Sequence, residues 1–130
     1  MNQDTRLWRQ VHPSFIEQEF PTSQTFRPTK KDEEKLSVDN GDIINAEESY
    51  LGHTEKGYLS VRVLAVTVGE CQEIDLEVEK DSDENFPAHA FIVFSGISKK
   101  EQKDKAKLLR DKAVNRGWEH KPTSFSAPHP

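Results

Sequence analysis

The chain has a single cysteine, and it lacks the long apolar runs and glycine-rich loops that mark several large protein classes. Cys71 cannot form a disulfide within the chain, which is typical of proteins from a reducing compartment. No run of about 18 apolar residues occurs, which argues against a membrane-spanning helix. The phosphate-loop patterns GxGxxG and GxxxxGK[ST] are missing as well. With no secretory pattern near the N-terminus, these absences predict a cytoplasmic protein with no membrane partner.

A large excess of positive charge is also missing. The 18 lysines and arginines stand against 23 acidic residues, for a net charge of −5. This balance argues against a nucleic-acid partner, since such proteins carry a basic footprint. A length of 130 residues fits one domain with one core. We expect a single compact domain over residues 7–118, with flexible ends over residues 1–6 and over the proline-containing residues 119–130.

The apolar pattern predicts several strands of a mainly antiparallel sheet. The most apolar run, residues 61–68, is dominated by β-branched side chains, and it indicates a strand buried on both faces that Gly69 ends. Other strands are expected at residues 7–12, 36–38, 74–79 and 88–94. We also expect a helical turn within residues 14–23 and an extended piece at residues 25–27.

Two main helices are predicted, and each begins at a capping sequence. Asn45, with Glu48 three residues on, predicts a helix that stops at Gly57. Ser98, followed by a glutamate three residues later, predicts a longer helix over residues 99–116. Two helices packed on an antiparallel sheet give an α+β fold.

Five side chains capable of chemistry lie on these predicted elements or directly after them: Cys71, His12, His53, His89 and Glu47. If the elements converge, an imidazole could take the thiol proton, and a carboxylate could orient that imidazole. The competing interpretation of Cys71 is a buried, inert side chain, and the residues alone favour it.

A metal site would draw on the same side chains, which are competent zinc ligands. Their spacing contains no HxxxH, CxxC or HxH pair, so we predict no metal and no resident cofactor. An anion or nucleotide site would instead use Arg9, because a strand arginine can hold a phosphate with two hydrogen bonds. An ordinary ion pair with a carboxylate is the alternative role for Arg9.

The predicted helix over residues 99–116 is rich in lysine. Its pattern indicates either a solvated face or a docking surface for an acidic partner. We expect a protein partner to bind there or at the tail over residues 119–130.

Three short segments resemble a known group of proteins. They are Leu7-Trp8-Arg9-Gln10-Val11-His12-Pro13-Ser14-Phe15, Ser23-Gln24-Thr25-Phe26-Arg27-Pro28 and Leu36-Ser37-Val38. The chain resembles, over about residues 7–118, small bacterial proteins associated with gene clusters for ubiquitin-like conjugation and anti-phage defence. Those clusters include small predicted hydrolases described by a Cys-Glu-His-His set. The resemblance implies Cys71 as nucleophile, His53 or His89 as base, and Glu47 as orienting carboxylate. His12 is a spare histidine, and Glu70 competes with Glu47.

The order of elements also resembles small ADP-ribosyltransferase domains, in which an early arginine and a later glutamate handle NAD. Arg9 and Glu47 would be the counterparts here, and NAD would be the cofactor. Three functions are therefore open: a hydrolase-like component of a ubiquitin-like or defence system, a non-catalytic protein-interaction module, and NAD-dependent ADP-ribosyl transfer.

Overall fold

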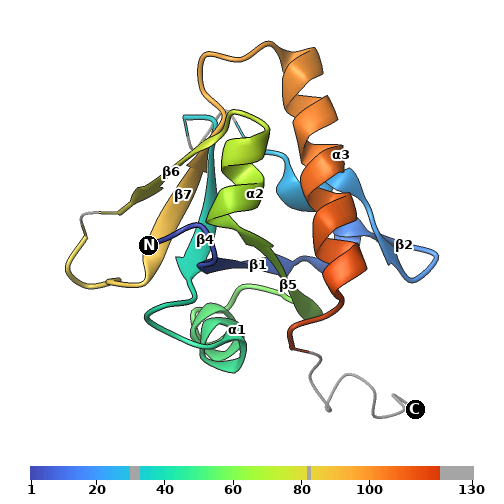
Figure 1. The fold of residues 1–130 in the computed structure, drawn as a ribbon. Helices are drawn as coiled ribbons and strands as arrows, with labels where there is room; N and C mark the ends of the chain where they lie inside the picture. Colours follow the sequence, from blue (N-terminus) through green and yellow to red (C-terminus); the bar gives the residue numbers. More distant parts are fainter. Residues whose placement is uncertain (30–32, 82, 121–130) are drawn as a thin grey trace.

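The computed structural model describes residues 1–29, 33–81 and 83–120. Its centre is a five-stranded sheet in the order β5-β1-β4-β7-β6, with every neighbouring pair antiparallel (Figure 1). The strands of this sheet are β1 (Arg6–Val11), β4 (Lys35–Asn40), β5 (Arg62–Thr67), β6 (Glu77–Lys80) and β7 (His89–Val93). A separate small sheet joins β2 (Ile16–Glu17) to β3 (Phe20–Pro21). The predicted α+β fold with an antiparallel sheet is confirmed.

Three α-helices pack on the sheet: α1 (Ala46–Glu55), α2 (Val68–Glu73) and α3 (Lys99–Arg116). The capping box predicted for α1 is present, because Asn45 and Glu48 each accept a hydrogen bond from the backbone N–H of the other. The Ser98 hydroxyl accepts a hydrogen bond at the start of α3. The two predicted main helices are therefore confirmed. None of the helices in the described ranges is long and apolar enough to cross a membrane.

The alternating side chains of β1 separate two cores on opposite faces of the sheet. Leu7 and Val11 belong to the larger core, which α2 and α3 cover. Trp8 points to the other face and packs against Ala46 of α1. Figure 1 shows α2 and α3 above the β1–β5 part of the sheet and α1 below it. The predicted burial of β5 on both faces is confirmed, since its four central residues are all buried.

Two segments differ from the expectations, and a third agrees with them only in part. A helical turn is present as the short 3-10 helix η1 (Pro13–Phe15), but the β2–β3 hairpin follows it, because Gln18 and Glu19 turn the chain with positive φ. The segment expected to be extended at residues 25–27 belongs mostly to η2 (Ser23–Phe26), a second 3-10 helix. The predicted strand at residues 74–79 begins only at Glu77.

The folded domain extends past the expected bounds of residues 7–118 at both ends. Thr5 is only 2% exposed, and β1 begins at Arg6. At the other end, Glu119 pairs with Arg6 at 2.6 Å, and His120 forms a bridge to β5. Most of the predicted flexible tail, residues 121–130, lies outside the described residues.

Candidate functional site

Cys71 lies on α2, with its side chain in the larger core. The side chain is 0% exposed. Burial, helped by the negative charge of Glu70, raises the pKa of the thiol to about 12. Because the thiolate is the reactive form, almost none of the nucleophile exists near neutral pH. The structure thus favours the interpretation of Cys71 as a buried, inert side chain.

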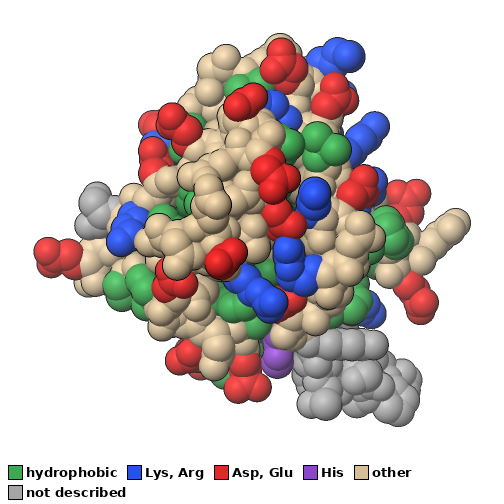
Figure 2. Space-filling view, viewed as in Figure 1, with side chains coloured by type: hydrophobic (Ala, Val, Ile, Leu, Met, Phe, Trp, Pro, Cys, Tyr) green, Lys and Arg blue, Asp and Glu red, His purple; other side chains and the backbone are tan. Residues whose placement is uncertain are grey.

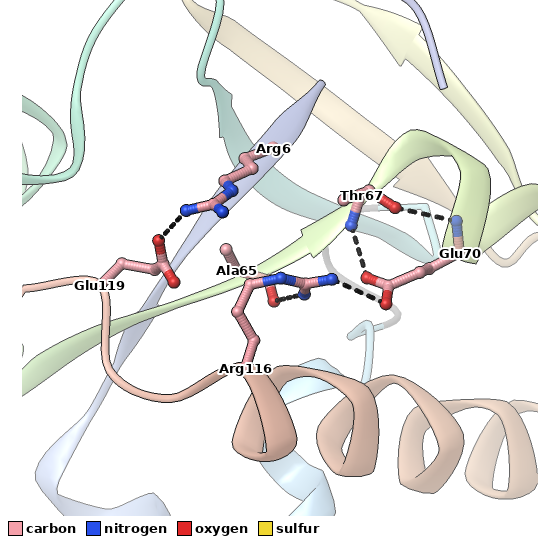
Figure 3. A network of polar contacts seen from close by, with 6 residues as sticks. All are labelled: Arg6, Ala65, Thr67, Glu70, Arg116 and Glu119. Carbon is pink, nitrogen blue, oxygen red and sulfur yellow. Dashed lines mark hydrogen bonds and ion pairs between the residues drawn. The ribbon is translucent and has the colours of Figure 1, made fainter. Parts of the chain in front are cut away.

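Glu70, the acidic neighbour of Cys71, is engaged in structural contacts. Its carboxylate accepts a hydrogen bond from the Thr67 backbone N–H and pairs with Arg116, each at 2.8 Å (Figure 3). Arg116 also donates to the Ala65 carbonyl. Burial alone would raise the pKa of Glu70, but the hydrogen bonds from Arg116 and Thr67 outweigh burial and lower the pKa. Glu70 therefore caps α2 and ties it to α3.

His89 and Glu47 also lie apart from Cys71. The Nδ1 atom of His89, on β7, lies 2.7 Å from the Asp81 carboxylate, and its ring meets Phe91 edge-on. This contact fastens the two ends of the connection between β6 and β7. Glu47 is exposed on the first turn of α1. The predicted convergence of Cys71, Glu47 and His89 is thus not seen.

The remaining predicted residues do meet, in a hollow of about 490 Å³. Its polar lining comes from β1, the turn after it, α1 and the loop that follows α1. These side chains are Arg9, Gln10, His12, Ser14, His53 and Tyr58. We call this hollow the histidine pocket. Two of the three predicted histidines and the predicted anion-binding arginine therefore share one site, although they come from distant parts of the sequence.

Arg9 reaches the pocket because β1 and β4 separate. These strands pair only at Leu7 and Trp8 on the β1 side. Beyond that point, the Arg9 guanidinium spans the gap and donates to the carbonyls of Thr25 at 2.7 Å and Ser37 at 3.0 Å. These side-chain hydrogen bonds take the place of backbone hydrogen bonds between β1 and β4. They also hold a permanent positive charge at the pocket.

His53 lies half-buried beside the ring of Tyr58, with 5.1 Å between the ring centroids. Burial lowers the pKa of His53, the nearby positive charge of Arg9 lowers it further, and a hydrogen bond with the Leu59 backbone opposes both effects. The ring is therefore neutral near neutral pH, and a neutral imidazole can accept a proton.

His12 is held by the turn that follows β1. Its Nδ1 accepts a hydrogen bond from the Ser14 backbone N–H at 3.0 Å, and it lies 2.7 Å from the Ser14 hydroxyl. A ring nitrogen that accepts from N–H carries no proton, so the neutral ring carries its proton on Nε2. His12 can therefore donate a hydrogen bond from Nε2, on the other side of its ring.

A partly buried chain of polar side chains holds Gln10. Its amide nitrogen donates to the Ser49 hydroxyl at 2.8 Å, and that hydroxyl donates to Asp39 at 2.6 Å. Its amide oxygen accepts from Ser60 at 2.8 Å. A network of this kind, in which each member has a hydrogen-bond partner, holds its side chains in place. Sequence reasoning missed the place of Gln10 in the pocket. Its partner Ser49 was a polar signal, because it lies four residues before His53 on the same inward face of the helix.

Comparisons with protein-family models, with curated proteins and with solved structures found no match to this chain. Among the residues that the structure describes, no group of three or more histidine, cysteine or acidic side chains is placed to hold a metal ion. The chemistry of the histidine pocket is therefore the basis for a functional proposal.

Proposed function

We propose that the protein is a small hydrolase-like domain that acts on an anionic substrate by imidazole chemistry in the histidine pocket. The observation that supports this proposal is the presence of His12, His53 and Arg9 around one hollow. His53, which is neutral near neutral pH, serves as the general base that takes a proton from the attacking water. The Nε2–H of His12 donates a hydrogen bond to the substrate, and Arg9 holds the negative charge of the substrate. The proton that His53 takes from water passes to the leaving group.

This proposal changes the roles that the resemblance to ubiquitin-like conjugation proteins implies. The nucleophile role of Cys71 is replaced, because its thiol is buried and protonated. The base is His53 rather than His89, since His53 lines the pocket. A cytoplasmic place in a ubiquitin-like conjugation or anti-phage system stays part of the proposal, and the resembling segments are its support.

The ADP-ribosyltransferase alternative has weaker support. Arg9 lines the pocket, but Glu47 lies exposed on the first turn of α1 and is not among the described residues that line it. An arginine without its glutamate partner can bind an anion but lacks the second group that the NAD reaction implies. The Arg9 charge therefore supports an anionic substrate in general more than NAD in particular.

The test uses chromogenic esters whose products absorb visible light. Hydrolysis of p-nitrophenyl phosphate, bis-p-nitrophenyl phosphate and p-nitrophenyl acetate is followed for the wild type, His53→Gln and His89→Gln. Loss of a general base costs about 100-fold to 10,000-fold in rate, so His53→Gln should fall by at least about 100-fold. His89→Gln, a change of the same chemistry outside the pocket, should retain the wild-type rate. Equal rates for the wild type and His53→Gln would overturn the proposal.

A further inference from the structure

The long helix α3 carries far more basic than acidic side chains. Its basic residues are Lys99, Lys100, Lys103, Lys105, Lys107, Arg110, Lys112 and Arg116, and its acidic residues are Glu101, Asp104 and Asp111. Figure 2 shows basic side chains spaced along α3 among carboxylates on the side turned to the viewer. The helical positions decide whether any side of α3 is free of acidic groups.

One row along α3 carries three lysines before it reaches an acidic residue. Lys99, Lys103 and Lys107 follow one another at intervals of four residues, so they form a row that we call the lysine stripe. At about 100° of rotation per residue, the acidic side chains of α3 lie at least about 80° around the helix from the centre of this row. Asp111 is the next residue of the same row, so the surface carries charge of one sign over the three lysines and ends there.

The lysine stripe is exposed and has no internal neutralisation. All three of its lysines are exposed. The nearest acids are already matched to other cations, since Asp104 pairs with Lys100 at 3.8 Å and Asp111 with Arg110 at 2.8 Å. Within the described ranges of the chain, no carboxylate pairs with a lysine of the stripe.

An apolar contact point lies on the hairpin beside the end of the stripe. The Arg110 guanidinium, three residues after Lys107, lies 5.5 Å from the centre of the Phe20 ring. Phe20 belongs to β3 and is 48% exposed. A row of cations that ends at an exposed aromatic ring offers both attraction and an anchor, and aromatic and arginine side chains are enriched at the cores of protein interfaces.

We propose that the lysine stripe and Phe20 dock an extended acidic segment of a protein partner. Successive lysines of the stripe are about 6 Å apart along the helix axis, since four residues rise by 1.5 Å each. In an extended chain, every second side chain lies on the same side, about 6.6 Å apart. A segment with an acidic residue at every second position therefore matches the stripe, and an apolar residue at its end would meet Phe20.

The charge of the whole chain favours a protein segment over a nucleic acid. The net charge of −5 repels a long polyanion, and three lysines form a short footprint. A peptide with a few carboxylates needs only the stripe. This surface is separate from the histidine pocket, because the residues that line the pocket do not come from α3.

Fluorescence anisotropy of a labelled peptide tests the proposal. The peptide has glutamate at every second position and phenylalanine last, and a second peptide of the same composition gathers its glutamates in one block. The protein variants are the triple change Lys99→Glu, Lys103→Glu and Lys107→Glu, and a control that changes Lys80, Lys105 and Lys112 to glutamate. The control alters the net charge equally but leaves the stripe intact. Circular dichroism confirms that both variants fold.

The stripe variant should bind the alternating peptide about tenfold more weakly than the wild type, as the loss of three exposed ion pairs implies. The control should bind within about twofold of the wild type, and binding should weaken at about 0.3 M salt. Equal losses in both variants, or equal affinity for the two peptides, would overturn the proposal. Tighter binding of a single-stranded RNA oligonucleotide than of the peptide would overturn the choice of partner.

Discussion

The thiol of Cys71 should be almost inert in the native protein. Its pKa rises from an ordinary value of 9.0 to about 12. Because each pKa unit changes the ionised fraction tenfold, this rise lowers the thiolate fraction near neutral pH by about 1,000-fold. The side chain is also fully buried, so a reagent reaches it only when the protein opens.

The assay is the reaction of the protein with Ellman's reagent slightly above neutral pH, followed by absorbance. Native protein should react at least about 1,000-fold more slowly than the same protein in denaturant, which exposes the thiol. A native rate close to the denatured rate would refute the account of Cys71.

The raised pKa also makes stability depend on pH. As pH rises past about 9, the unfolded chain loses the thiol proton while the folded chain keeps it, so the free energy of unfolding falls. The fall is up to about 1.4 kcal/mol per pH unit until pH reaches about 12. Urea unfolding of the wild type and Cys71→Ala over this pH range isolates the effect, because only the wild type carries it. Parallel curves for the two proteins would contradict the burial argument.

Three further predictions concern the pocket, the hydrogen-bond network beside it and the space around two glycines. Because the pKa of His53 is lowered in the folded protein, the unfolded chain binds a proton first as pH falls through about 6.5. The free energy of unfolding should therefore fall over this pH range in the wild type and not in His53→Gln, which urea unfolding at several pH values would show. Ser49→Ala should lower the free energy of unfolding, measured with urea, by about 1–3 kcal/mol, because it removes the buried hydroxyl that bonds to both Asp39 and Gln10. A change near zero would contradict this network. Gly41→Ala should lower the melting temperature, because the added Cβ would lie 2.6 Å from a backbone oxygen. Gly52→Ala in α1 should raise the melting temperature, because its Cβ meets no atom within 4 Å and alanine favours the helix. A higher melting temperature for Gly41→Ala than for Gly52→Ala would refute this account of the packing.

The helices could be predicted from the sequence because their signals are local. The caps at Asn45 and Ser98 act within three residues, and both were readable without any knowledge of the fold. The same kind of signal preceded α2, where Thr67 and Glu70 form a capping box. It was overlooked because the apolar run before Gly69 indicates a strand, and a six-residue helix adds little pattern of its own.

The site could be predicted only in part. Arg9, His12 and His53 could be identified from the sequence as polar side chains on predicted elements, but their grouping depends on which face of the sheet each element covers. Helix α1 covers one face and α2 the other, so His53 and Cys71 lie in separate layers. Arg9 reaches the pocket because two strands separate, which no local pattern encodes.

The most direct test of the histidine pocket is an NMR titration of the histidine ring signals with inorganic pyrophosphate near neutral pH. The signals of His12 and His53 should shift together and saturate at one pyrophosphate concentration, because both rings line one hollow with Arg9. The His89 signal should stay in place, and His53→Gln should weaken the shift of His12. Unchanged signals of His12 and His53, or a shift confined to His89, would contradict the account.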